Sequence, residues 1–279
     1  MAMLMANSFG QSPDKLIVPD GSAPAGESLL LPLSIAGPSP VVAMQFDVRF
    51  TKSIVDVLGP IAAGDSNHRI MSREVSAGLR RVVVYSRSNA LLPKDVIIDL
   101  PMVMMVAGAP PPPGGSSASP SPMIRIEGLC FALENGTKIT PAIQRGPVDS
   151  WFFSHFTPAE LQVPSIYGDS SDPDGDGLPN LIEFGVGGSP FTYDAPLLPA
   201  VTTETGPGGE DLWRMTYRKS KTANGVVIEP QISPNLVDWT ALIATPTGAE
   251  DALSIEMTTS VDKAAAPRRF MRLSVRRSE

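Results

Sequence analysis

The chain has 279 residues, of which 42% are hydrophobic and 18% charged, so it can bury a sizeable core and is long enough for two domains. Its formal net charge of −7 argues against nucleic acid or an anionic membrane as a partner. No stretch approaches the ~20 apolar residues that cross a bilayer, so no membrane span is expected. The 29 prolines and 24 glycines favour short strands and turns over long helices.

Two features near the start and middle of the chain bear on its compartment. Residues 1–14 are predicted to be a tail, and its first ten residues are apolar and then small, without a basic residue. They resemble the end of a secretory signal whose beginning is missing, and a vector-derived leader would give the same pattern. The single cysteine, Cys130, excludes an intrachain disulfide and a cysteine-based zinc site, and its apolar surroundings predict a buried structural thiol.

Short apolar runs separated by glycine and proline follow the tail. The clearest run has apolar residues at every second position, which predicts a strand with one dry face: Met44, Phe46, Val48 and Phe50. Further strands are expected at residues 16–19, 29–35, 80–86, 96–106 and 124–133. Regular short strands with turn-rich links predict an antiparallel β-sandwich over residues 15–148.

Three parts of this region resemble a cohesin-type module. They are the turn at Gly26 and Glu27 before an apolar strand, the segment 43–48, and the basic and then apolar strand 81–86, which is followed by the long apolar strand 96–106. The resemblance extends over residues 15–145. It implies a nine-stranded jelly-roll sandwich, and because some cohesin modules bind calcium-loaded dockerins through one sheet face, it also implies a protein partner.

Residues 109–120 are of low complexity, with four consecutive prolines followed by glycine and serine. Such a run cannot join a strand ladder, because proline has no N–H to donate. It is predicted to be a loop inserted between two strands, open to the first proteolytic cut, rather than a polyproline ligand for a partner.

The most specific motif is residues 172–183, which have carboxylates at positions 1, 3, 5 and 12, a glycine at 6 and an amide at 9. This is the ligand order of an EF-hand-type calcium loop, whereas a solvated acidic turn would be the alternative. Gly177 permits the sharp turn that such a loop needs. The predicted Ca²⁺ ligands are the carboxylates of Asp172, Asp174, Asp176 and Glu183, the Leu178 carbonyl, and Asn180 directly or through water.

The same loop predicts a static calcium site rather than a sensor. Position 8, where paired EF-hands join by backbone hydrogen bonds, is Pro179, which suits the first turn of the following helix instead. That helix is expected to be short, ending near Gly185, Gly187 and Gly188. No second loop of this pattern exists in the sequence, so the loop cannot open a helix pair as sensors do.

Residues 149–195 are predicted to be a short helical connector that contains this loop. Thr157 and Glu160 are spaced as a capping box with Pro158 at the first helical position. The run from Trp151 to Pro190 resembles thrombospondin type-3 or dockerin-like calcium segments of large exported bacterial proteins. The resemblance implies a rigid, calcium-set spacer, although a complete dockerin has two loops and this chain has one.

Residues 196–279 are predicted to form a second β-sandwich. Polar and apolar residues alternate over 212–218, Asn224 and Gly225 indicate a hairpin turn, and further strands are expected near 232–240 and 269–275. This region resembles the small β-sandwich that often follows such calcium segments in exported bacterial proteins.

Motifs for catalysis are missing from the sequence. Its two histidines, His68 in a polar turn and His155 among aromatic residues, are not part of any hydrolase signature. No catalytic residue is therefore assigned, and a non-catalytic protein is favoured over an enzyme. Trp151, Trp213 and Trp239 could form a sugar-stacking platform or pack within the protein.

The sequence thus predicts a mainly β chain: two antiparallel, jelly-roll-like β-sandwich domains joined by a short helical calcium-binding connector. We expect an exported, non-catalytic calcium-binding protein of the bacterial cell surface or medium, in which one sandwich binds a protein or a surface. The alternative is a carbohydrate-active protein, either a glycan-binding module or a glycoside hydrolase, with a polysaccharide partner. Partner identity and oligomeric state stay open.

Overall fold

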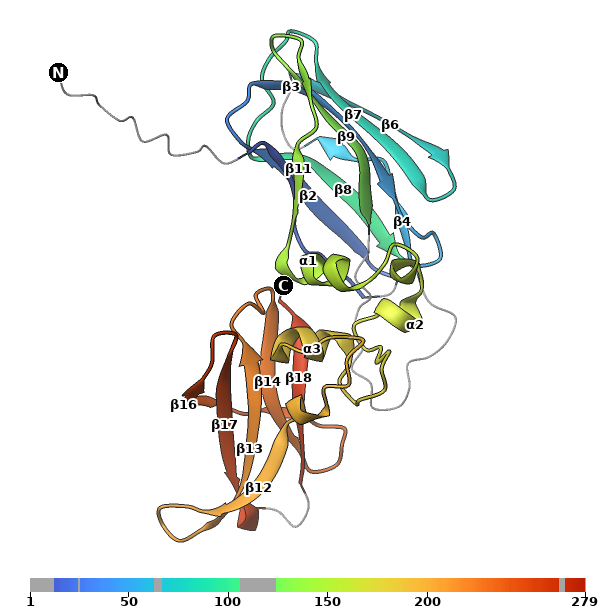
Figure 1. Ribbon diagram of the computed structural model, residues 1–279. Coiled ribbons are helices and arrows are strands. Elements are labelled where there is room, and N and C mark those ends of the chain that lie inside the picture. The colour runs from blue at the N-terminus through green and yellow to red at the C-terminus, as the bar shows by residue number, and fades with distance from the viewer. Residues whose placement is uncertain (1–12, 25, 63–66, 106–123, 266–268, 279) are drawn as a thin grey trace, which may run out of the picture. The chain divides into compact units, whose positions relative to one another are not determined.

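The computed structural model describes residues 13–24, 26–62, 67–105, 124–265 and 269–278 (Figure 1). The expected signal remnant and the predicted proline-rich loop therefore lie outside the described residues. The chain divides into two compact units: unit 1 holds residues 1–21, 26–106 and 124–145, and unit 2 holds the remainder, chiefly 146–279. The prediction of a mainly β chain is confirmed, because strands make up both units.

Unit 1 is a sandwich of two sheets. One sheet has the order β11-β1-β2-β8-β4, with β5 also paired to β8; its strands are β1 Lys15–Val18, β2 Ser28–Ala36, β4 Val55–Val57, β5 Ile61–Ala62, β8 Val96–Met104 and β11 Ala142–Arg145. The other has the order β10-β9-β3-β7-β6; its strands are β3 Val41–Arg49, β6 His68–Ser76, β7 Leu79–Ser86, β9 Arg125–Leu133 and β10 Lys138–Ile139. All predicted strands of this region are present.

The core of unit 1 forms because alternate side chains of each strand point to one face. Met44, Phe46 and Val48 of β3 are at most 2% exposed, and they lie in register with β7, where Val82 and Val84 are equally buried. The period-two pattern therefore identified the inward face correctly.

Two local predictions for unit 1 are corrected. His68 is not in a polar turn: it opens strand β6 and is 6% exposed, with Nε2 3.1 Å from the Ala90 carbonyl oxygen. The strand was missed because residues 68–76 are mostly polar, as suits an edge strand. Cys130 on β9 is only partly buried, because it points to the outer side of the sheet, in register with Gln45.

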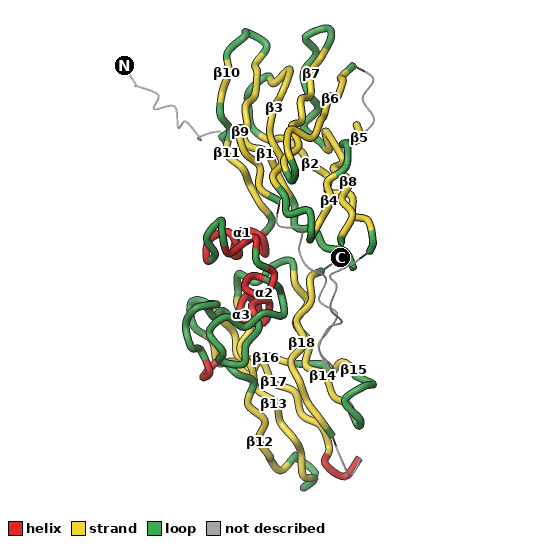
Figure 2. The backbone as a smooth tube through the Cα atoms, turned by 90° about the vertical axis from the view of Figure 1, so that its right-hand side faces the viewer, coloured by secondary structure: helices red, strands yellow, loops and turns green. Residues whose placement is uncertain are grey.

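Unit 2 begins with three helices, which Figure 2 shows in red: α1 Pro147–His155, α2 Pro164–Tyr167 and α3 Asn180–Val186. Two sheets follow. The first has the order β12-β13-β17-β16; its strands are β12 Ala200–Thr205, β13 Asp211–Ser220, β16 Thr245–Glu250 and β17 Ser254–Asp262. The second has the order β15-β14-β18; its strands are β14 Val226–Ser233, β15 Thr240–Ala241 and β18 Phe270–Arg277. Short 3₁₀ turns lie at Glu160–Gln162, Ala195–Leu197 and Lys263–Ala265. None of the helices in the described ranges is long and apolar enough to cross a membrane.

The predicted hairpin at Asn224 and Gly225 is wrong. The turn is present, with Gly225 at a φ of 82°, but β13 pairs with β12 and β17 whereas β14 pairs with β15 and β18. The chain therefore crosses from one sheet to the other at this turn. A turn signal fixes the local backbone and not the strand partner, and here the crossing gives β13 a second sheet to cover its apolar side.

Helix α3 is part of the core of unit 2. Its Val186 is 1% exposed and packs with Met215 and Tyr217 of β13 and Leu273 of β18. The approach is close, because a Cβ on Gly185 would lie 3.3 Å from Ile228 Cδ1 and from Val275 Cγ2. Residues 149–195 thus belong to the same compact unit as residues 196–279.

A buried ion-pair group joins the first half of unit 2 to its last strand. Arg277 of β18 donates from Nε and Nη2 to the two carboxylate oxygens of Asp169, both at 3.0 Å, and from Nη1 to Asp149 Oδ1 at 3.3 Å. The three side chains are at most 7% exposed. Asp149 lies on α1 and Asp169 lies three residues before the acidic loop, so one guanidinium fixes both segments to the sheet.

Removing this guanidinium would leave two buried carboxylates without their cation. We expect Arg277→Ala to lower the free energy of unfolding of unit 2 by about 3–5 kcal/mol. Arg276→Ala is the control, because Arg276 is 53% exposed and its pair with Glu229 is long at 3.9 Å, so it should cost no more than about 0.5 kcal/mol. All three tryptophans belong to unit 2, and tryptophan fluorescence during chemical denaturation measures that unit alone. Equal effects of the two substitutions would contradict a stabilising role of the buried pair.

Candidate metal centre

The acidic loop runs from the end of α2 into α3. The sequence predicted Pro179 in the first turn of α3; the helix begins at Asn180, so Pro179 is its N-cap. The helix ends as predicted, with Gly187 at a left-handed φ of 85°. Both Gly187 and Gly188 donate their backbone N–H to the Glu183 carbonyl, at 2.7 and 2.8 Å.

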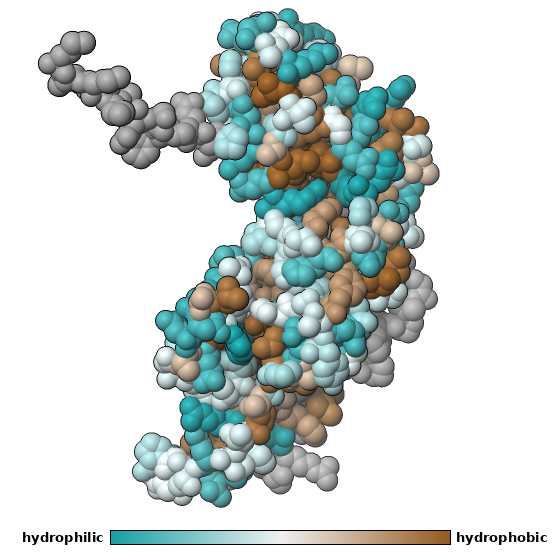
Figure 3. All heavy atoms as spheres, in the orientation of Figure 1, coloured by the Kyte–Doolittle hydropathy of each residue, from teal (hydrophilic) through white to brown (hydrophobic). Residues whose placement is uncertain are grey.

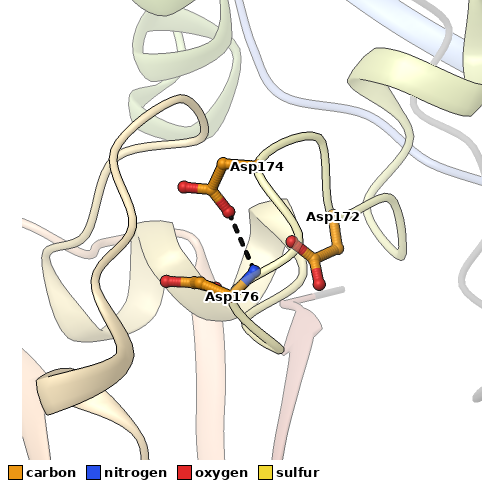
Figure 4. Close-up of side chains that lie close together, drawn as sticks. All are labelled: Asp172, Asp174 and Asp176. Atoms are coloured by element: carbon orange, nitrogen blue, oxygen red, sulfur yellow. Dashed lines mark hydrogen bonds between the residues drawn. The ribbon is translucent and has the colours of Figure 1, made fainter.

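The loop gathers three carboxylates at its centre. Asp172, Asp174 and Asp176 each place an oxygen within 4.8 Å of the others (Figure 4). Backbone N–H groups of the loop hold them in place: Asp174 Oδ1 accepts from the Asp176 N–H at 3.2 Å, and Asp176 Oδ1 accepts from the Leu178 N–H at 2.7 Å. Of these three carboxylates, only Asp174 keeps an oxygen, Oδ2, without a hydrogen-bond partner in the described chain.

The turn itself depends on two glycines. Gly175 and Gly177 have φ values of 75° and 93°, which side chains other than glycine rarely adopt. In this conformation both of their N–H groups reach the carboxylate of Asp172, each at 2.9 Å. Gly177 therefore has the role expected from the sequence.

Glu183 is the most unusual group of the loop. It is 0% exposed, and neither carboxylate oxygen has a hydrogen-bond partner in the described part of the chain. Burial first, and then the charges of Asp174, Asp176, Asp194 and Asp172, raise the pKa of the Glu183 carboxyl to about 8. A carboxylate buried without a partner is strongly unfavourable, so this position needs a cation or a proton.

The side-chain nitrogen and oxygen of Asn180 have different surroundings. It is 0% exposed, and its Nδ2 donates to the carbonyls of Ile166 and Gly168 at 2.8 and 2.9 Å, which ties α3 to α2. Its Oδ1 has no partner in the described chain. The amide group therefore fixes the helix with its nitrogen and keeps its oxygen available.

Unpaired buried oxygens are concentrated in this loop. Within the described ranges, five buried side-chain polar atoms have no hydrogen-bond partner, and four of them belong to predicted ligands: Asp174 Oδ2, Asn180 Oδ1, Glu183 Oε1 and Glu183 Oε2. Buried polar groups are nearly always hydrogen-bonded in folded proteins, so such a group of exceptions requires an explanation. A cation bound in the loop would account for these atoms, although only Asp172, Asp174 and Asp176 bring their oxygens within 4.8 Å of one another.

One acidic residue near the loop was not found from the sequence. The Asp194 N–H donates to Asp176 Oδ2 at 2.6 Å, although the two residues are 18 positions apart. The Asp194 carboxylate accepts from the Ser189 N–H at 3.0 Å. No local pattern links Asp194 to the loop, because the contact depends on how the chain returns after α3.

The other candidate side chains do not form a site together. His68 belongs to unit 1, and His155 belongs to unit 2, where its ring packs 4.5 Å from that of Trp151. The tryptophans lie on separate elements and contact protein groups: Trp151 packs on aromatic rings including Phe184, Lys263 covers Trp213, and Arg272 covers Trp239. This arrangement fits the packing interpretation of the tryptophans.

Comparisons with known proteins find similarity only at the level of structure. No family model and no curated protein matches the chain. Among solved structures, the sixth cohesin of scaffoldin B from Acetivibrio cellulolyticus, solved with a Cel5 dockerin mutant, is similar over 48% of this chain and 99% of its own, at 15% identity and a TM-score of 0.38. The cohesin module of a family 33 glycoside hydrolase from Clostridium perfringens is similar over 48% and 98%, at 12% identity and a TM-score of 0.38. A non-cellulosomal cohesin from Archaeoglobus fulgidus is similar over 47% and 86%, at 13% identity and a TM-score of 0.35. About half of the chain is thus similar to cohesin modules.

Proposed function

We propose that unit 2 is a calcium-binding structural module. The observation that carries the proposal is Glu183, a fully buried carboxylate without a partner at the last ligand position of the loop. The carboxylates of Asp172, Asp174, Asp176 and Glu183, the Leu178 carbonyl and the Asn180 side chain would hold the ion. When bound, Ca²⁺ would supply the positive charge that offsets these carboxylates.

The donor set selects among metal ions by its chemistry. All of the side-chain donors are oxygens, which suits hard cations and not zinc, whose sites contain nitrogen or sulfur ligands. Mg²⁺ keeps most of its waters and rarely uses a cage built wholly from protein groups. A loop that surrounds the ion and ends in a glutamate therefore favours Ca²⁺.

The position of the loop determines what ion binding would stabilise. Its last residues are helix α3, which lies in the core of unit 2 through Val186. Three residues before its start lies Asp169, which Arg277 of β18 holds. Ion binding to the ordered loop is therefore coupled to the folding of unit 2. That calcium also makes residues 149–195 a rigid spacer between the two sandwiches remains a prediction.

We place this module outside the bacterial cell. Calcium is abundant there, and loops of this type in extracellular proteins bind it with modest affinity, about 10⁻⁴–10⁻³ M. In this role no catalytic group is needed, because the ion acts by stabilising structure.

The calcium proposal predicts a stability change that depends on Glu183. At a hundredfold excess of Ca²⁺ over its Kd, binding adds about 2.7 kcal/mol, so the melting temperature of unit 2 should rise by roughly 8–10 °C. Glu183→Gln keeps the shape and should abolish this rise, whereas Glu210→Gln in the β12–β13 turn should retain it. Thermal melts by tryptophan fluorescence, with calcium and with chelator, measure the effect. A wild-type protein whose melting temperature does not change at about 10–100 mM calcium, a hundredfold excess over the expected Kd, would show that the proposal is wrong.

The outer face of one sheet of unit 1 favours a second role, binding of a protein partner. On edge strand β6 the exposed Arg69, Met71 and Arg73 alternate with inward residues, and Met71 is 62% exposed. On the neighbouring strand β7, the residues in register with Arg69, Met71 and Arg73 are Tyr85, Val83 and Arg81, in that order. Figure 3 shows hydrophilic and hydrophobic residues interspersed over the visible surface of both units.

Charge on this face indicates what kind of partner fits. Arg81 is already paired with Asp47 of β3, with Nε to Oδ1 at 2.7 Å and Nη2 to Oδ2 at 2.8 Å. Arg69 and Arg73 form no such pair among the described residues, so two cations flank the apolar Met71. We therefore propose an acidic protein segment as the partner, since a glycan would be expected to use a row of aromatic rings.

A glutamate-rich peptide is the probe for this face, with a sulfated polysaccharide as the competing probe. The double change Arg69→Glu and Arg73→Glu should weaken peptide binding at low salt by tenfold or more, because two attractions become repulsions. Arg87→Glu, in the exposed loop after β7, is the control and should change binding little. Binding can be followed by fluorescence anisotropy of the labelled peptide. Stronger binding of the polysaccharide than of the peptide would contradict a protein partner.

A further inference from the structure

The segment after α3 returns to the acidic loop instead of leaving it. Gly187 and Gly188 end the helix, and six residues later the Asp194 N–H reaches Asp176 Oδ2 at 2.6 Å. Farther along, Leu198 Cδ2 lies 3.8 Å from the point where Gly177 would carry a Cβ. Residues 187–198 therefore cover part of the loop.

The carboxylate of Asp194 and the side-chain carbons of Glu183 border the same small space. A Cβ built on Gly188 would lie 3.4 Å from Asp194 Oδ2 and 3.3 Å from Glu183 Cβ. Because Gly188 has no Cβ, it leaves this space open to the Asp194 and Glu183 side chains.

We propose that Asp194 is a fifth acidic residue of the calcium centre, supplied from outside the twelve-residue loop. It acts in two ways: its backbone N–H positions Asp176, and its carboxylate adds negative charge beside Glu183. This inference rests on the proposed calcium-binding function and adds a residue that the loop pattern does not contain.

The added charge has opposite consequences with and without the ion. Without calcium, Asp194 increases the repulsion around a buried carboxylate and destabilises unit 2. With calcium, it increases the attraction for a divalent cation, and the affinity of such sites rises with the charge of their ligands. A residue that merely supported the fold would stabilise both states.

Asp194→Asn separates these possibilities. The amide keeps the size of the side chain, an oxygen that can accept from the Ser189 N–H, and the backbone N–H to Asp176. We expect calorimetry to show Ca²⁺ affinity reduced by about tenfold, as for the loss of one nearby charge. We also expect an unchanged or higher melting temperature in chelator. Asp211→Asn, the same charge change at the start of β13, is the control and should leave affinity within about twofold.

The outcomes distinguish this inference from the function on which it rests. If the wild type binds calcium and Glu183→Gln does not, the centre exists. If in that case Asp194→Asn binds as tightly as Asp211→Asn, Asp194 is not part of the centre. A lower melting temperature of Asp194→Asn in chelator would assign it a purely structural role and would also overturn the inference. If the wild type binds no calcium at all, the proposed function itself fails.

Discussion

The buried carboxylate of Glu183 is the constraint on which unit 2 depends. It is 0% exposed, lacks a hydrogen-bond partner in the described chain, and lies among the other carboxylates of the loop. No lysine or arginine forms an ion pair with these carboxylates within the described ranges, whereas Asp149 and Asp169 nearby share Arg277. Within the described ranges, unit 2 thus neutralises the pair Asp149 and Asp169 with its own guanidinium but supplies no such cation to the carboxylates of the loop.

Backbone hydrogen bonds connect the buried ion pair of Asp169 to the start of helix α3 in the acidic loop. The Leu181 N–H donates to the Asp169 carbonyl at 3.1 Å, and the Asn180 N–H donates to the Ser171 carbonyl at 2.8 Å. The same short stretch therefore holds the guanidinium of β18 at one end and begins the acidic loop at the other. Because α3 also packs in the core, order in the loop, in the helix and in the last strand should change together.

Local patterns in the sequence predicted what local chemistry determines. The alternation around Phe46 located an inward face, and the glycines after Val186 located a helix end. The spacing of Thr157 and Glu160 located two reciprocal hydrogen bonds, at 2.6 and 3.3 Å, but the predicted helix from Pro158 is wrong, because only a 3₁₀ turn at Glu160–Gln162 follows. The same patterns located the acidic loop, in which the structure gathers three carboxylates and buries Asn180 and Glu183.

Contacts between distant residues were not predictable in this way. Arg277 and Asp169 are 108 positions apart, and the sequence predicts only a strand near residues 269–275. Asp194 joins the loop through the path of the chain after α3, and the turn at Gly225 changes sheets because of what β13 must cover. In each case the packing of the whole fold decides which residue or strand is the partner, and the spacing of nearby residues does not determine it.

The central claim is that a calcium ion accounts for the unpaired oxygens of the loop. A crystal structure of the protein grown with calcium, with anomalous scattering recorded, tests it most directly. The account predicts one anomalous peak bounded by Asp172, Asp174, Asp176 and Glu183, with both Glu183 oxygens turned toward it. An empty loop in which Glu183 donates a proton to a neighbouring carboxylate, in crystals saturated with calcium, would contradict it.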